Sequence, residues 1–248
     1  MTYSSKEKMR LQKFIAHSGY CSRRKAETLI EQGKVKVNGK KVTEMGVLVD
    51  DSDFVEVEGN ALTRDTNFVY YLLNKPRGVL STADDEFNRD TVIQGLPDDK
   101  RIYPVGRLDK ESTGAIILTN DGTFTHYMTH PSYDLEKHYR VSVDGLLDYD
   151  VINLLKEGIT IDGVSYQGVI ISNVKQIKGK NRTTFNITLH EGKNRQIRKI
   201  FEHFNLPVLK LHRFALGPID INDLSIGEYR KLSNHEVKKL LLSAKGIL

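Results

Sequence analysis

The nine residues from Gly106 to Gly114 are the part of this chain whose residue types could best support chemistry. They read Gly-Arg-Leu-Asp-Lys-Glu-Ser-Thr-Gly, so Asp109 stands in a glycine-bounded loop with a cation on each side. Because glycine adopts sharp and positive-φ turns, such a loop can hold a carboxylate out of a sheet and toward a ligand. The same residue types also build ordinary turns between strands. The loop by itself therefore leaves a catalytic and a structural role open for Asp109.

The elements that must position this loop are mostly β-rich. A β-rich run at 101–105 precedes the loop and an apolar run at 115–118 follows it. Apolar or alternating stretches predict further strands at 68–73, a central strand that stops before Lys75-Pro76, and at 164–174 and 182–190. Helices are predicted at 148–156, at 193–204 with the apolar stripe Ile197, Ile200, Phe201 and Phe204, and after the capping box Ser233 to Glu236. Runs of strands with only a few helices predict an α+β architecture.

The first sixty residues are predicted to form a separate small module. Ser22 can cap a helix, and Gly33 can end it. The dipeptide Asn38-Gly39 between alternating stretches predicts a β-hairpin. We therefore expect two helices on a small, mostly antiparallel sheet over residues 1–60. A polar linker over about 59–67 and a second domain over 61–248 are expected to follow.

The charge distribution favours an acidic partner for one face of this module. The whole chain has a formal net charge of +5, which permits such a partner without proving one. Residues 1–41 hold eleven Lys and Arg against three acidic residues, whereas residues 42–60 hold six acidic residues and no Lys or Arg. A cationic block beside an acidic one suits phosphate binding on one side only. The acidic segment at 79–101 is predicted to be an exposed loop.

Four segments resemble the motifs of RNA pseudouridine synthases, in the branch that modifies bacterial ribosomal RNA. Besides the loop, they are Leu73-Asn74-Lys75-Pro76-Arg77-Gly78, Lys137-His138-Tyr139-Arg140-Val141 and Glu191-Gly192-Lys193-Asn194-Arg195-Gln196-Ile197-Arg198, in family order. The resemblance implies a catalytic domain built on a mixed, mainly antiparallel sheet with flanking helices and an RNA cleft across its middle. It also implies Asp109 as nucleophile, Tyr139 as a residue that stacks on the base and carries a proton, and Arg195 as the cation beside the carboxylate.

Residues 10–58 resemble the S4 RNA-binding domain. The matching segments are Arg10-Leu11-Gln12-Lys13-Phe14, Cys21-Ser22-Arg23-Arg24-Lys25 and Gly33-Lys34-Val35-Lys36-Val37-Asn38-Gly39. The N-terminus of the second helix would attract phosphate through its dipole and its basic side chains. We expect RNA contacts in this module from Arg10, Lys13, Arg23, Arg24, Lys25 and Lys36. In the second domain we expect them from Lys75, Arg77, Arg107, Lys110, Lys193 and Arg198.

The resemblance implies the isomerisation of a specific uridine in ribosomal RNA, expected to be the 23S RNA of the large subunit. The C1′–N1 bond breaks, the uracil turns, and the ring rejoins through C5. Composition does not change, so no cofactor is expected. A uridine within paired RNA must be flipped out to react. An ordinary aspartate is ionised at neutral pH. In a dry pocket burial disfavours the ionised form, so a nearby cation is needed to keep the carboxylate charged.

Three other readings compete with this one. His126 and His130 could share a helix face around zinc, but the Glu of a His-Glu-x-x-His motif is missing and Pro131 follows at once. Asp84, Asp85 and Glu86 could hold magnesium, although such clusters are more often solvated loops. We therefore expect no metal site. The remaining alternative is a non-catalytic S4-domain RNA-binding or ribosome-assembly factor, for which Asp109, Tyr139 and Arg195 would not all be needed.

The composition is that of an ordinary globular chain. Apolar residues make up 39% of the 248 residues and charged residues 28%. Cys21 is the only cysteine, which leaves no internal disulfide or thiolate metal cluster. No apolar run approaches the length of a bilayer span, and the first eight residues lack the apolar core of a signal peptide. We expect a cytoplasmic monomer that does not bind membranes.

Overall fold

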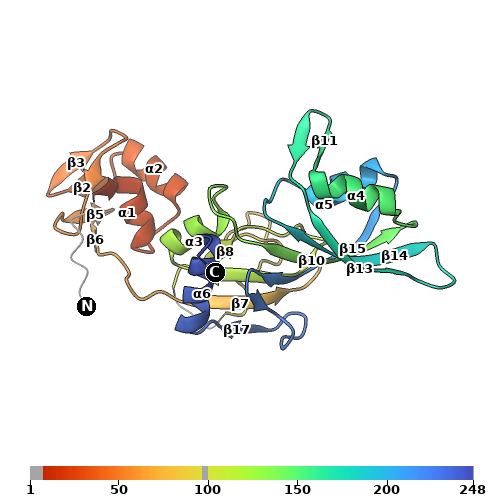
Figure 1. Ribbon diagram of the computed structural model, residues 1–248. Coiled ribbons are helices and arrows are strands. Elements are labelled where there is room, and N and C mark those ends of the chain that lie inside the picture. Colours follow the sequence, from red (N-terminus) through yellow and green to blue (C-terminus); the bar gives the residue numbers. More distant parts are fainter. Residues whose placement is uncertain (1–7, 97–99, 248) are drawn as a thin grey trace. The chain divides into compact units, whose positions relative to one another are not determined.

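The structure is a computed structural model that describes residues 8–96 and 100–247. The chain divides into two compact units. The first comprises residues 1–69 with 97–102 and 120–122, and the second comprises the remainder. Figure 1 shows the helices and strands of each unit. The polar N-terminal segment and part of the acidic segment at 79–101 lie outside the described residues, so the expectations about them stay expectations.

The first unit packs two helices on a four-stranded antiparallel sheet of order β3-β2-β5-β6. Its helices are α1 (Leu11–His17) and α2 (Arg23–Glu31), and its sheet strands are β2 (Val35–Val37), β3 (Lys40–Val42), β5 (Val55–Val57) and β6 (Asn60–Leu62). A separate pair joins β1 (Met9–Arg10) to β4 (Leu48–Val49). The Ser22 hydroxyl accepts from the backbone N–H of Lys25, which confirms the predicted cap. Apolar side chains of both helices and the strands bury one another in a single core.

Two tight turns shape this small sheet. Asn38 and Gly39 both have positive φ, at 51° and 77°, which is the geometry that a two-residue hairpin with right-handed twist requires. A second hairpin of the same kind turns at Glu58 and Gly59. The predicted linker at 59–67 is therefore wrong over residues 60–62, which form β6. The Glu58-Gly59 pair could have signalled this turn, but the residues after it are too polar to read as a strand.

The second unit is built on one nine-stranded sheet whose main path runs β13-β14-β10-β15-β9-β7-β17. Its strands are β7 (Tyr70–Lys75), β8 (Tyr103–Val105), β9 (Thr113–Thr119), β10 (Lys137–Asp144), β13 (Ile170–Gln176), β14 (Arg182–Leu189), β15 (Val208–Leu216), β16 (Ile219–Asp220) and β17 (Tyr229–Lys231). The pairing of β15 with β9 is parallel, and the other pairings in this sheet are antiparallel. The predicted mixed, mainly antiparallel sheet and the α+β class are confirmed.

Helices cover this sheet at two places, as Figure 1 shows. Side chains of α3 (Gly122–Thr129) and α6 (Asn234–Ala244) pack with β9 in one core that includes Phe124, Leu240 and Ile117. At the other end, Phe201 of α5 (Gln196–His203) packs against Phe185 of β14, with ring centroids 4.9 Å apart. The predicted capping box at the start of α6 is present.

Four predicted elements differ in detail. Strand β7 is a buried strand between β9 and β17, as predicted for a central strand, but it continues through Lys75 instead of stopping before it. The strand predicted at 164–174 is interrupted, because β12 (Val164–Tyr166) pairs with β11 (Ile159–Ile161) before β13 begins. Helix α4 (Tyr149–Glu157) buries Ile152 and Leu155 and leaves Leu154 exposed.

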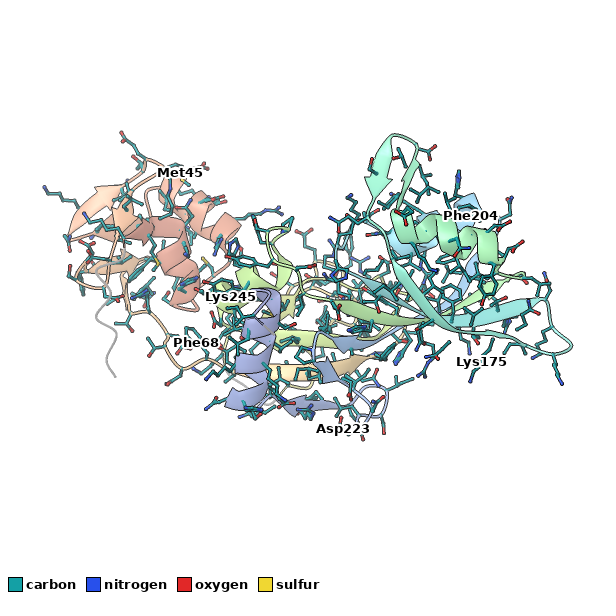
Figure 2. The ribbon with its side chains drawn as sticks, in the orientation of Figure 1. Met45, Phe68, Lys175, Phe204, Asp223 and Lys245 are labelled. Carbon is teal, nitrogen blue, oxygen red and sulfur yellow. The ribbon has the colours of Figure 1, made fainter. Side chains whose placement is uncertain are left out.

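Helix α5 is the fourth of these elements. It begins at Gln196, three residues later than predicted. Phe204, which Figure 2 labels, is half-buried just after the end of α5 instead of continuing the buried stripe. Among the described residues no helix is long and apolar enough to cross a membrane.

Candidate active site

The loop between β8 and β9 carries Asp109. Gly106 has a φ of +74°, which turns the chain out of β8, and the buried Leu108 anchors the loop next to the carboxylate. The Ser112 N–H donates to the Asp109 carbonyl at 3.0 Å, which closes a turn before β9 begins. Both ends of the loop are thus fixed by β-structure, so the position of Asp109 follows from the sheet.

The segment around Lys75 holds this loop from the other side. The Lys75 ammonium is fully buried and donates to the carbonyls of Ser112 at 2.8 Å, Pro76 at 3.0 Å and Lys110 at 3.3 Å. Ser81 exchanges two hydrogen bonds with the backbone of Leu108. Burial lowers the pKa of Lys75 to about 8. The expectation that Lys75 contacts RNA is therefore corrected, because all three of its N–H groups are used inside the protein.

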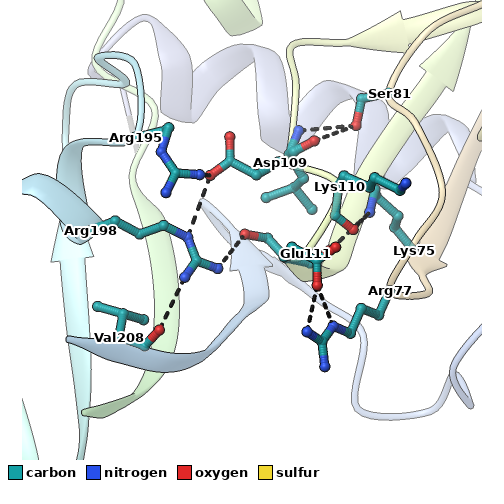
Figure 3. Close-up of polar contacts among 11 residues, drawn as sticks. Lys75, Arg77, Ser81, Asp109, Lys110, Glu111, Arg195, Arg198 and Val208 are labelled. Atoms are coloured by element: carbon teal, nitrogen blue, oxygen red, sulfur yellow. Dashed lines mark hydrogen bonds and ion pairs between the residues drawn. The ribbon is translucent and has the colours of Figure 1, made fainter. Parts of the chain in front are cut away.

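Two guanidinium groups stand beside the Asp109 carboxylate, as Figure 3 shows. Arg195 Nη1 and Arg198 Nε both lie 3.6 Å from Asp109 Oδ2. This distance is that of an ion pair and not of a tight hydrogen bond. Two guanidinium groups beside one carboxylate balance its negative charge and can orient it toward a ligand.

The two arginines are held very differently. The Arg195 side chain is 50% exposed, and its backbone adopts a left-handed conformation at the N-cap of α5. Arg198 is only 13% exposed, donates to the Val208 carbonyl at 3.1 Å and lies 3.5 Å from the Ser112 hydroxyl. Burial and the neighbouring Arg195 lower the pKa of Arg198, while Asp109 opposes them. Arg195 was predicted to lie within the helix, but it is the N-cap residue that precedes α5. Of the two arginines beside Asp109, Arg198 is held more firmly.

Tyr139 is the third residue of β10 and lines the same cavity as Asp109. The cavity has a volume of about 610 Å³ and belongs entirely to the second unit. That size is within the range of about 300–1,000 Å³ that small-molecule clefts occupy. The Tyr139 side chain is largely buried, so its ring forms part of the cavity wall. The predicted nucleophile, aromatic residue and arginine are thus brought to one cavity.

Two cavity-lining residues did not emerge as catalytic candidates from the sequence. Arg213 of β15 is 4% exposed and approaches the Tyr139 hydroxyl at 3.4 Å through Nη1. Lys137 lies two residues before Tyr139, and burial lowers its pKa to about 8. The sequence does contain a pattern that could have identified Arg213 as a functional residue. This arginine replaces an apolar residue in the buried alternation Leu211, Arg213, Ala215.

The other basic residues expected to bind RNA in this unit lie at or near the surface. Arg107 and Lys110 are exposed on the Asp109 loop, and Arg107 also lines the cavity. Arg77 is exposed and pairs with Glu111 at 2.5 Å. Lys193 lines the cavity, pairs with Glu191 at 2.8 Å and lies over the Tyr166 ring. Their RNA contacts stay predictions.

In the first unit, Arg23, Arg24 and Lys25 form the first turn of α2 and are exposed. Arg10 and Lys36 are exposed as well, and Lys13 is half-buried. Among the described residues there is no group of three or more His, Cys, Asp and Glu side chains arranged to hold a metal. The rings of His126 and His130 pack against each other at 4.6 Å.

Comparisons with known proteins agree with this arrangement. A family model described as RNA pseudouridylate synthase matches residues 69–203, and the model of the S4 domain matches residues 9–55. Ribosomal large subunit pseudouridine synthase B of Bacillus subtilis (strain 168) is 43% identical over 93% of this chain and 95% of that protein. The dual-specificity RNA pseudouridine synthase RluF of Escherichia coli (strain K12) is 37% identical over 92% of this chain and 77% of that protein. A crystal structure of a pseudouridylate synthase, 30% identical, covers 94% of this chain and 99% of its own with a TM-score of 0.67.

The two family matches together place the chain among the enzymes that modify RNA. The chain belongs to the RNA pseudouridine synthases, in the branch that has an N-terminal S4 domain and includes large subunit synthase B. It is an enzyme that binds RNA through its S4 domain and makes pseudouridine.

Proposed function

We propose that this enzyme converts one uridine of bacterial large-subunit ribosomal RNA to pseudouridine, with Asp109 as the nucleophile. One observation carries the proposal. The Asp109 carboxylate stands between two guanidinium groups at a cavity that Tyr139 also lines. The choice of large-subunit RNA is supported by the 43% identity to a large subunit synthase along nearly the whole chain.

The chemistry follows from what these side chains can do. The target uridine is flipped out of the RNA into the cavity, because its reacting atoms are out of reach in a stacked strand. Tyr139 packs against the uracil ring. Asp109, beside Arg198 and Arg195, acts as nucleophile while the C1′–N1 bond breaks. The uracil then turns and bonds through C5, and the Tyr139 hydroxyl carries a proton during the rearrangement.

Basic residues on both units grip the RNA backbone. Arg107 and Lys193 line the cavity, where they can contact the phosphates on either side of the flipped nucleotide. The exposed residues Arg23, Arg24 and Lys25 offer cations at a helix N-terminus, which is a favourable place for phosphate. The RNA therefore meets the protein at the S4 domain and at the catalytic cavity.

The test is the release of tritium from ribosomal RNA that carries tritium at C5 of uridine. Each new C1′–C5 bond displaces one C5 hydrogen to water, so released label counts turnovers. We expect release from large-subunit RNA. Release from small-subunit RNA alone contradicts the choice of substrate, and no release from either RNA contradicts the ribosomal assignment.

Asp109→Asn is the matched variant for this test, because it keeps the shape of the side chain and removes the negative charge. We expect it to lose turnover completely while RNA binding stays within a factor of a few. If the wild-type protein, like the variant, binds RNA but shows no turnover, the alternative of a non-catalytic RNA-binding factor is favoured. Mapping pseudouridines in cells with and without the enzyme then identifies the target uridine.

A further inference from the structure

Arg213 occupies a central position in the catalytic sheet. Strand β15 runs between β10 and β9, so Arg213 is paired with Tyr139 on one side and with Gly114 on the other. It lines the same cavity as Asp109 and is 4% exposed. This arginine therefore belongs to the wall of the cavity and not to its rim.

The Arg213 guanidinium is only partly satisfied by the protein. Its Nε donates to the Ala115 carbonyl at 2.7 Å, and its Nη1 lies 3.4 Å from the Tyr139 hydroxyl. Its Nη2 is buried and has no hydrogen-bond partner, and no carboxylate pairs with the group among residues 8–96 and 100–247. A buried charge without a counterion costs several kcal/mol of stability. Buried charged groups that lack partners within the protein are found at functional sites, where a ligand supplies the missing partner.

Lys137 adds a second cation to the same wall. It lies two residues before Tyr139 on β10, so both side chains point to the same side of the sheet. Its ammonium donates to the carbonyls of Leu135 at 2.9 Å and His190 at 3.3 Å, which leaves one of its three N–H groups for a ligand. The buried Arg213 and the half-buried Lys137 thus both lie close to Tyr139, whose ring would meet the uracil.

The proposed reaction creates a negative charge at this place. When the C1′–N1 bond breaks, its electron pair leaves with the base, and the charge spreads over N1 and the two carbonyl oxygens of the uracil. An enzyme accelerates such a step by placing fixed positive groups where the charge develops. Charges with little exposure to solvent act more strongly than charges at a surface.

We propose that Arg213 and Lys137 stabilise the negative charge that the uracil carries while it is detached from the ribose. This inference rests on the proposed function and adds two catalytic residues to it. The balance of the step is complete without further reactants. Asp109 bonds to C1′ as the C1′–N1 pair goes to the uracil. C5 then uses a ring pair to bond to C1′ while the Asp109 oxygen leaves with its own pair, the C5 proton goes to solvent, and N1 gains a proton. Both cations keep their protons throughout.

An RNA phosphate is the other anion that these cations could meet, and the two roles predict different defects. Loss of a phosphate contact weakens RNA binding for every substrate alike. Loss of anion stabilisation slows bond breaking, and it does so most for a uracil that tolerates negative charge poorly. Fluorine at C5 withdraws electrons and makes the uracil a better leaving group. A comparison of uridine with 5-fluorouridine therefore separates the two roles.

The experiment compares the wild-type enzyme with Arg213→Met, Lys137→Met and the control Arg140→Met. Arg140 is an exposed arginine on the same strand, beside Tyr139 and on the opposite side of the sheet. Single-turnover rates are measured on two transcripts of the substrate RNA, one with uridine and one with 5-fluorouridine throughout. The consumption of the target nucleoside is followed by nuclease digestion and chromatography, and RNA dissociation constants are measured in parallel.

For Arg213→Met we expect a loss of about 100-fold in rate on uridine, and a loss roughly tenfold smaller on 5-fluorouridine. Lys137→Met should show the same substrate dependence with a smaller loss, and Arg140→Met should resemble the wild type on both. RNA affinity should not change. Equal losses on the two substrates, or weaker RNA binding at an unchanged rate, overturn the inference.

Folding and function are controlled separately. Where Arg213→Met fails to fold, as judged by its thermal unfolding, Lys137→Met and the charge-conserving Arg213→Lys carry the same substrate comparison. Arg213→Lys should recover part of the rate on uridine. An inactive wild-type enzyme overturns the proposed function itself. An active wild-type enzyme whose variants show no dependence on the leaving group overturns only the role of Arg213 and Lys137.

Discussion

At the residue scale, two arginines lie at the same distance from Asp109 but are not equivalent. Arg198 is shielded from solvent and anchored on the Val208 carbonyl, whereas Arg195 is half exposed and has no such anchor in the hydrogen bonds of the described chain. An exposed ion pair contributes little, because solvent screens it and its side chains remain mobile. A fixed guanidinium can hold the carboxylate in one orientation. Arg198 should therefore matter more to Asp109 than Arg195 does.

A pair of charge-conserving variants tests this difference. We expect Arg198→Lys to lower the single-turnover rate by about 100-fold, since lysine cannot reproduce the forked contacts to Asp109 and Val208. Arg195→Lys should cost no more than roughly threefold, because an exposed pair is worth about 1 kcal/mol or less. Tritium release under single-turnover conditions measures both. Equal losses in the two variants contradict the assignment of Arg198 as the principal partner.

The pH dependence of the reaction should report the charge of Lys137. Burial and Arg213 lower its pKa to about 8, whereas Asp134 and Glu191 act in the opposite direction. The lysine is therefore mostly charged at pH 7 and loses its charge as the pH rises through about 8.

We expect the single-turnover rate to fall over this alkaline range in the wild-type enzyme. In Lys137→Arg the fall should move to higher pH, because a guanidinium stays protonated there. His190 and Tyr139 also lie near Lys137 and are unchanged in this comparison. If the rate falls over the same alkaline pH range in both proteins, the loss of the Lys137 charge is not the cause of the fall.

At the element scale, the close approach of β9 to β15 sets the position of the cavity wall. Gly114 has a φ of +110° and faces the backbone of Arg213. A Cβ atom at this residue would lie 2.1 Å from the Arg213 carbonyl oxygen and 2.7 Å from its nitrogen. Neither atom can move without separating the two strands. The last residue of the catalytic loop motif is thus a packing requirement and brings the Asp109 loop next to Arg213.

Gly114→Ala should destabilise the second unit by about 3 kcal/mol or more, because strain and a backbone clash act together. Gly163→Ala is the matched control, since Gly163 also has positive φ, at +76°, but no atom within 4 Å of a Cβ. The control should lose only about 1 kcal/mol from backbone strain. Urea unfolding of both variants measures the difference. A loss no larger at Gly114 than at Gly163 would falsify the packing explanation.

At the scale of the whole molecule, the S4 domain binds RNA, and we propose that the RNA also reaches the catalytic cavity. Three exposed basic residues in the first turn of α2 present cations at a helix N-terminus. Each cation that neutralises a phosphate releases counterions from the RNA. The salt dependence of binding therefore reports how many phosphates the S4 domain neutralises.

We expect the double change Arg23→Gln and Arg24→Gln to weaken RNA binding and to flatten its salt dependence. The slope of log K against log salt should decrease by about 0.7–0.9 for each phosphate that the variant no longer neutralises. The double change Lys238→Gln and Lys239→Gln on α6 removes the same charge from two exposed residues outside the S4 domain. It should leave the slope nearly unchanged. Equal effects of the two double changes would indicate that only net charge matters.

Several parts of this architecture follow from local pattern. The cap at Ser22, the Asn38-Gly39 hairpin and the strands on both sides of the Asp109 loop are fixed by residues that are neighbours along the chain. Predictions from such local patterns agree with the folded structure because they depend on backbone preferences and on the period of apolar residues. The start of α5 was predicted less well, since the left-handed Arg195 before it leaves no mark in the residue types.

The sequence alone determined the family, the loop that presents Asp109, and the two-part organisation with an S4 module, because each of these is written in contiguous residues. The tertiary structure decided which cations lie around Asp109 and its cavity. It buried Lys75 under the loop, put Arg198 beside Asp109, and placed Arg213 between Tyr139 and Gly114. The reason is physical. The period of a strand tells which of its residues share a face, but which strands become neighbours is set by long-range packing of the whole sheet.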